Sequence, residues 1–136
     1  MKKLVVFGGI ILFLSNCTDL GTGSGKSKNG SEVSFAEDIQ PIFNAYCAYE
    51  GCHVEGHITG LNLSGGISYS NLVNVSSASY FPLIRVFPTE PDSSVLYLKI
   101  TGDPSVGQVM PPKDPVLNIN QINLIEEWIL DGAENN

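Results

Sequence analysis

The chain has 136 residues, and its 14 acidic side chains outnumber the 7 basic ones, which gives a formal net charge of −7 at pH 7. This length predicts a single folded domain. An acidic chain of this size repels nucleic acid, so we exclude nucleic acid as a partner and expect a basic protein partner if there is one.

The first residues have the features of an exported protein. Lys2 and Lys3 give a basic start, and residues 4–14 form an apolar run that ends three residues before Cys17. This run has the length of a signal-peptide core and is too short to cross a bilayer easily. We therefore expect residues 1–16 to be a signal peptide, and the alternative of an N-terminal transmembrane anchor is disfavoured by the length.

The ending Leu14-Ser15-Asn16-Cys17 resembles the lipidation motif of bacterial lipoproteins. The resemblance implies cleavage before Cys17 and attachment of the chain to a membrane through lipid on this cysteine. More than one acyl chain would be needed for lasting attachment. Thr18, where some lipoproteins have aspartate, implies the periplasmic side of the outer membrane rather than the inner membrane. Residues 17–33 are rich in Gly, Ser, Lys and Asn and predict a lipidated flexible tether.

The folded domain is expected over residues 34–136, beginning with a helix that reaches Cys47. Ser34 and Asp38 are both candidate caps. Asp38 is preferred, because Pro41 then falls in the first helical turn, where its missing N–H costs nothing. One face of this helix would carry the apolar side chains Ile39, Ile42, Phe43 and Tyr46.

The middle of the domain predicts short helices separated by loops. A helix is expected over residues 68–75. Another is expected from 92 to 100, with Glu90 as its cap, Pro91 in its first turn and Gly102 at its end. The run Val95-Leu96-Tyr97-Leu98 also fits a strand, because it is short and its period is ambiguous.

The last predicted helix covers residues 119–131. Asn118 is the expected cap, with Gln121 three residues later, and Leu117 and Ile122 could form a hydrophobic staple. Gly132 is the expected stop. The apolar face consists of Ile122, Ile125, Trp128 and Ile129.

The segment Cys47-Ala48-Tyr49-Glu50-Gly51-Cys52-His53 matches the pattern of covalent haem attachment, in which two cysteines precede a histidine that binds the iron. The usual spacer between the cysteines has two residues, and here it has four. Two alternatives stay open. Cys47 and Cys52 could form a disulfide without haem, or they could bind zinc together with His53 and His57. Zinc is disfavoured, because the adjacent Cys52 and His53 cannot easily reach one tetrahedral ion.

A second candidate ligand is Met110, the only methionine after the initiator, which precedes Pro111 and Pro112. The prolines restrict the backbone and could hold the methionine sulfur over an iron. The alternative is a methionine that only fills space in the core. His57 lies four residues from His53, too close to reach the opposite side of a haem, and is expected to be a solvated loop residue.

Together these features resemble single-domain c-type cytochromes, and most closely the bacterial lipoprotein cytochromes with a widened C-x4-C-H motif. The resemblance implies an all-α, monohaem domain whose helices pack around one covalent haem c. It implies thioether links at Cys47 and Cys52, with His53 as the proximal and Met110 as the distal iron ligand. The segments that carry the resemblance are 38–43, 47–53, 110–112 and 125–133.

The resemblance also implies that the protein is a one-electron carrier in the bacterial envelope and not an enzyme, with a redox protein as its partner. A thioether ligand favours Fe(II) more than a second imidazole would. Arg85, the only arginine, would pair with a haem propionate or lie on the surface. Phe43 and Trp128 are expected near the haem edge. The rival functions are a haem-free lipoprotein for binding or scaffolding, with a Cys47–Cys52 disulfide, and a haem enzyme or sensor with Met110 off the iron.

Overall fold

The computed structural model describes residues 32–113 and 115–136. The predicted signal peptide, the lipidation site at Cys17 and the tether up to residue 31 lie outside the described residues. Val33, the last residue of the predicted tether, is 6% exposed and packs in the core, so the folded part extends one residue further than expected. Within the described ranges, no helix has the length and apolar character needed to span a membrane.

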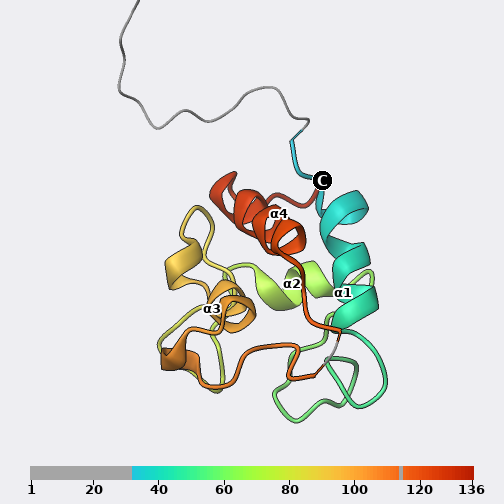
Figure 1. Ribbon diagram of the computed structural model, residues 1–136, viewed down its shortest axis with the longest axis vertical. Coiled ribbons are helices and arrows are strands. Elements are labelled where there is room, and N and C mark those ends of the chain that lie inside the picture. Colours follow the sequence, from blue (N-terminus) through green and yellow to red (C-terminus); the bar gives the residue numbers. More distant parts are fainter. Residues whose placement is uncertain (1–31, 114) are drawn as a thin grey trace, which may run out of the picture. The chain divides into compact units, whose positions relative to one another are not determined.

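The described residues form short helices joined by long loops (Figure 1). The β-type pairing among them is limited to three isolated bridges, and the described part contains no strand. The all-α prediction is therefore confirmed at this level, and the strand alternative for residues 95–98 is wrong. In chain order the elements are the π-helix η1 (Phe35–Ile39), α1 (Gln40–Tyr46), α2 (Ser68–Leu72), the 3-10 helix η2 (Pro91–Ser93), α3 (Val95–Thr101), the 3-10 helix η3 (Pro104–Val106) and α4 (Ile119–Leu130).

The first helix is capped by Ser34 and not, as predicted, by Asp38. The Ser34 hydroxyl accepts a hydrogen bond from the Glu37 N–H at 3.2 Å, and the Asp38 carboxylate accepts one from the Ser34 N–H at 2.8 Å. The helix then opens as the wider η1 turn before Pro41. A proline cannot donate the next hydrogen bond, and its ring conflicts with the carbonyl four residues earlier. A π turn ahead of it accommodates both.

The helix predicted over 92–100 is divided in two by Ser94. Glu90 precedes η2, with Pro91 in its first turn as expected, but Ser94 is extended and α3 starts after it. The Ser94 hydroxyl is buried, accepts a hydrogen bond from the Phe87 N–H at 2.8 Å and donates one to the Glu90 carbonyl at 2.8 Å. Gly102 ends α3 with a φ of +77°, as the sequence predicts.

The helix α2 is shorter than the predicted 68–75, because the chain pairs with a distant segment after Leu72. Val73 forms a parallel bridge with Val86, and the N–H of Val86 donates to the Leu72 carbonyl at 3.1 Å. These bonds pull the backbone out of the helix. The competing partner is remote in sequence, so local periodicity could not reveal it.

The predicted cap of α4 is confirmed, and the helix ends at Leu130, one residue before the predicted end. The Asn118 side chain accepts from the Gln121 N–H at 3.1 Å, and the Gln121 side chain accepts from the Asn118 N–H at 2.9 Å. This reciprocal pair is a capping box. Gly132 follows the helix with a φ of +109°.

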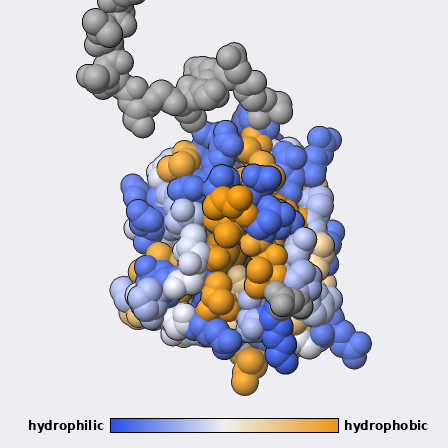
Figure 2. Space-filling view, viewed as in Figure 1, coloured by the Kyte–Doolittle hydropathy of each residue, from blue (hydrophilic) through white to orange (hydrophobic). Residues whose placement is uncertain are grey.

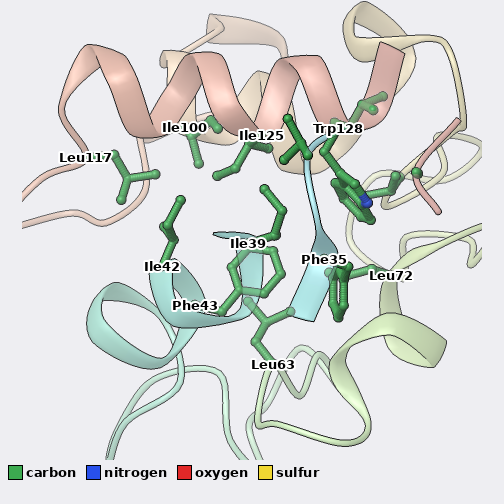
Figure 3. Packing of buried hydrophobic residues seen from close by; sticks show 14 residues of the cluster. Phe35, Ile39, Ile42, Phe43, Leu63, Leu72, Ile100, Leu117, Ile125 and Trp128 are labelled. Atoms are coloured by element: carbon green, nitrogen blue, oxygen red, sulfur yellow. The ribbon is translucent and has the colours of Figure 1, made fainter. Parts of the chain in front are cut away.

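The core lies where η1 and α4 meet (Figure 3). The ring centroids of Phe35 and Trp128 are 5.2 Å apart, and Phe35 also contacts Tyr69 at 5.3 Å and Phe43 at 6.2 Å. Trp128 is 1% exposed. Burying side chains of this size provides the main stabilising term of a small domain.

The last described residues fold back onto the start of the domain (Figure 1). The backbone carbonyl of Asn136 accepts a hydrogen bond from the Ala36 N–H at 3.0 Å, and its side-chain oxygen accepts one from the Phe35 N–H at 2.8 Å. The indole N–H of Trp128 donates to the Glu134 carbonyl at 2.9 Å. The two ends of the folded part therefore stabilise each other, and they hold η1 and α1 in place.

Some apolar side chains remain at the surface. Figure 2 shows hydrophobic residues gathered along the middle of one face, between hydrophilic residues on both sides. Ile58, Phe81 and Ile119 are 96%, 80% and 67% exposed. Part of the surface of this small domain is therefore apolar.

We expect Asn136→Ala to lower the free energy of unfolding by about 1 kcal/mol, because the Phe35 N–H would lose its acceptor. Urea denaturation followed by circular dichroism measures this change. The control is Asn135→Ala, at an exposed neighbour, which should change stability by less than about 0.5 kcal/mol. Equal losses in the two variants would contradict the role given to Asn136.

Candidate cofactor site

The segment between Cys47 and His53 is a closed hydrogen-bonded loop at the end of α1. Cys47 is the residue after the helix, and its N–H donates to the Phe43 carbonyl at 2.9 Å. Its carbonyl accepts from the His53 N–H at 2.9 Å. Gly51 adopts a φ of +82°, a conformation that favours glycine. The four-residue spacer is therefore folded back, and it brings His53 next to the end of the helix.

The two cysteines are free thiols in different surroundings. Burial, and to a lesser extent the neighbouring Cys52, raise the pKa of Cys47 to about 12. Cys52 lies in a turn, where its N–H donates to the Tyr49 carbonyl at 2.9 Å. A side-chain hydrogen bond with Cys52 raises the pKa of the Tyr49 hydroxyl. The Cys47 thiol, which is half-buried, is thus protonated at neutral pH.

His53 is held as a neutral imidazole. Burial is the largest cause that lowers its pKa, with smaller contributions from His57, Arg85 and Lys99, and the Leu61 carbonyl works in the opposite direction. Its Nδ1 atom is buried and has no hydrogen-bond partner among the residues that the structure describes. A buried polar atom without a partner costs free energy. A neutral ring is also the form of histidine that binds metals.

His57 is not the solvated loop residue that the sequence predicted. Its ring packs edge-on against His53, with centroids 4.6 Å apart, and it is half-buried. The His57 Nδ1 accepts from the Thr59 N–H at 3.3 Å and lies 2.8 Å from the Thr59 hydroxyl. The Thr59 hydroxyl accepts in turn from the Leu61 N–H at 3.3 Å. These bonds hold the His57 ring in contact with the His53 ring. The sequence gave no signal for this contact.

Met110 reaches the same region from a distant part of the chain. It is half-buried, and its N–H donates to the Lys99 carbonyl of α3 at 2.9 Å. The Met110–Pro111 peptide bond is cis. The methionine is therefore placed by contact with α3 as well as by the prolines that follow it.

Two adjacent cavities share the walls formed by Cys47, His53, Thr59 and Met110. The first has about 850 Å³ of space free of protein atoms, including its mouth, and the second about 600 Å³. Cys52 lines the second cavity only. The structure thus brings together the four residues that the sequence singled out as haem-binding.

The first cavity is mostly apolar, with basic groups in its wall. Its apolar side chains are Leu61, Leu63, Leu72, Val95, Leu96 and Ile100. Arg85 and Lys99 are the basic groups. A concave, apolar site with a few polar groups is typical of cofactor pockets.

Arg85 is not a surface residue. It is half-buried, and its guanidinium donates to the Asn71 carbonyl at 2.8 Å and to the Thr59 carbonyl at 3.5 Å. Burial lowers its pKa from the ordinary value. The group faces the cavity in a fixed orientation and is suited to a carboxylate there.

Phe43 and Trp128 lie elsewhere than the sequence suggested. Both are fully buried in the core, and neither lines either of these two cavities. Leu63 and Leu72 belong to both the core and the cavity wall, and they take the place that was expected for the aromatic rings. Leu63 lies in a loop and Leu72 at the end of α2, so the two share no periodic pattern that could have predicted this role.

The donor types and the surroundings fit a haem. The Cys47 thiol, a neutral imidazole and a thioether line an apolar cavity whose wall also holds two cations, and the Cys52 thiol lines the adjacent cavity. These are the groups that attach and ligate haem in c-type sites.

No protein-family model, curated protein or solved structure matches this chain. Within residues 32–113 and 115–136, no group of three or more His, Cys, Asp or Glu side chains could hold a metal ion. The side chains around the two cavities are therefore the features that indicate what this site could bind.

We expect Cys47 in the haem-free variant Cys17→Ala/Cys52→Ala to react with iodoacetamide at pH 8 on the order of 100-fold more slowly in the folded protein than in urea. Only the thiolate reacts, and a pKa of about 12 leaves very little of it. Removing Cys52 leaves the main cause, burial, in place. Mass spectrometry measures the rates, and circular dichroism checks that the variant is folded. Equal rates would show that the thiol is not buried.

Proposed function

We propose that this protein is a c-type cytochrome-like electron carrier that holds one covalent haem and is tethered by lipid on Cys17 to a membrane of the bacterial envelope. The observation that supports this most is that Cys47 and His53 line one apolar cavity together with Met110, which comes from a distant part of the chain. When bound, the haem iron would supply the one-electron change between Fe(III) and Fe(II).

The cysteines would attach the group. Each thiol would add across one vinyl group, with its sulfur bonded to one carbon and its hydrogen to the other. Cys47, at the rigid end of α1, would fix one attachment point. Cys52, in the turn with Tyr49, would fix the second. A thiol adds without any change of charge in the buried cavity, which matches the protonated state of Cys47.

His53 and Met110 would serve as axial ligands. The neutral His53 ring has a lone pair to offer, and its Nδ1 atom has no hydrogen-bond partner among the described residues. Met110, which lines the same two cavities, would give a soft thioether. If both side chains bound the iron in each oxidation state, electron transfer would require little rearrangement.

Arg85 would interact with a propionate carboxylate and would hold the polar edge of the group at the basic side of the cavity. The apolar side chains exclude water from the rest of the cavity and so influence the redox potential. The acidic net charge of −7 favours a basic redox partner.

The first test is the absorption spectrum of protein produced in a host with the machinery for covalent haem attachment, recorded before and after boiling in detergent. We expect a Soret band that stays with the polypeptide after denaturation. Cys47→Ala/Cys52→Ala should lose the band on denaturation, because no thioether remains. A colourless wild-type protein, made beside another c-type cytochrome that matures normally, would refute the proposal. It would favour the haem-free lipoprotein with a Cys47–Cys52 disulfide, which a thiol titration would detect.

We expect Met110→Ala to bind carbon monoxide in the reduced state, whereas the wild type should bind it poorly, because the variant leaves one axial position open. Spectral titration with carbon monoxide measures the difference. The control is Val116→Ala, which changes an exposed residue beyond the two prolines and should behave as the wild type. If the wild type binds carbon monoxide as readily as Met110→Ala does, Met110 is not a ligand, and a haem enzyme or sensor becomes the better description.

A further inference from the structure

The loop that carries Met110 is hydrogen-bonded to the C-terminal end of α3. The Met110 N–H donates to the Lys99 carbonyl at 2.9 Å. Lys99 is in the last turn of α3, where backbone carbonyls have no partner within the helix. The bond therefore satisfies a helix end and fixes the backbone of Met110 at the same time.

The side chain of Lys99 holds the same loop at a second point. Its ammonium donates to the Gln108 carbonyl at 3.1 Å and lies 5.0 Å from the centroid of the Tyr80 ring. A cation over an aromatic face is held electrostatically. Lys99 therefore makes one hydrogen bond on each side of Val109, through its carbonyl and through its ammonium.

The middle of the loop packs on the end of the same helix. Val109 Cβ lies 3.5 Å from the position that a Cβ on Gly102 would take. Gly102 has a φ of +77°, which ends α3 and turns the chain. Tyr80, whose ring lies beneath the Lys99 ammonium, also approaches Gly107. A Cβ placed on Gly107 would lie 3.8 Å from the Tyr80 hydroxyl oxygen. The loop is thus contacted along its length by α3 and Tyr80.

We propose that Lys99 is a positioning residue for Met110, which fixes the thioether against the cavity by holding the Gln108–Met110 loop to the end of α3. Lys99 and Met110 line the same cavity, so the contact lies at the site itself. This inference rests on the proposed haem site. Lys99 does not bind the iron; it limits how far the methionine can move away from it.

The test uses the full-length holoprotein and the variants Lys99→Met, Lys99→Arg and Lys113→Met. Lys99→Met keeps the length and the apolar stem but removes the ammonium. We expect the reduced variant to bind carbon monoxide about fivefold faster than the wild type, because the loop releases Met110 more often; this factor corresponds to about 1 kcal/mol. Lys99→Arg should restore most of the wild-type rate, because arginine can donate to the same carbonyl. Lys113→Met, at an exposed lysine after Pro112, should have no effect.

A second measurement does not depend on the iron. Hydrogen exchange followed by mass spectrometry should show faster exchange of the Met110 amide in Lys99→Met, with the α4 amides unchanged. Uniformly faster exchange would mean general destabilisation and would overturn the positioning role. An unchanged Met110 amide together with unchanged carbon monoxide binding would also overturn it. A colourless wild type would instead refute the proposed function, and the amide exchange would still report whether Lys99 holds the loop.

Discussion

The contact between Phe35 and Trp128 joins the two ends of the folded chain, and the rest of the domain depends on it. The rings lie 5.2 Å apart between η1 and α4, in the centre of the core. A domain of this size has little surplus stability, so a few large buried rings make a large contribution. Because α1 follows η1 without a break, this contact also determines where Cys47 lies at the end of α1.

The candidate site lies next to this core and shares part of it. Leu63 and Leu72 contact the core on one side and the cavity on the other. The Leu63 N–H also donates to the His53 carbonyl at 2.9 Å, so the loop after the histidine is fixed to the core. The site is therefore positioned by packing, although most of its residues are in loops.

The site contains features that cost stability. An apolar cavity reduces the dispersion contacts of the side chains around it, and the buried Nδ1 of His53 has no hydrogen-bond partner. Such features are common where a protein binds a ligand, because the binding groups must stay available. A group that filled the cavity and used the imidazole would remove both costs, and the proposed haem would do so.

The sequence by itself determined the helical class, the two ends of α4, the end of α3 at Gly102 and the residues of the candidate site. These depend on local signals: the Asn118–Gln121 box, a glycine with a positive φ and a pair of cysteines before a histidine. Only the tertiary structure decided that Met110 faces the same cavity as His53, that His57 packs on His53 and that Lys99 holds the methionine loop. It also moved the first cap to Ser34 and shortened α2. Most of these outcomes depend on hydrogen bonds and packing between residues that are remote in sequence. The cap at Ser34 depends on a π turn ahead of Pro41. Neither cause leaves a periodic pattern in the sequence.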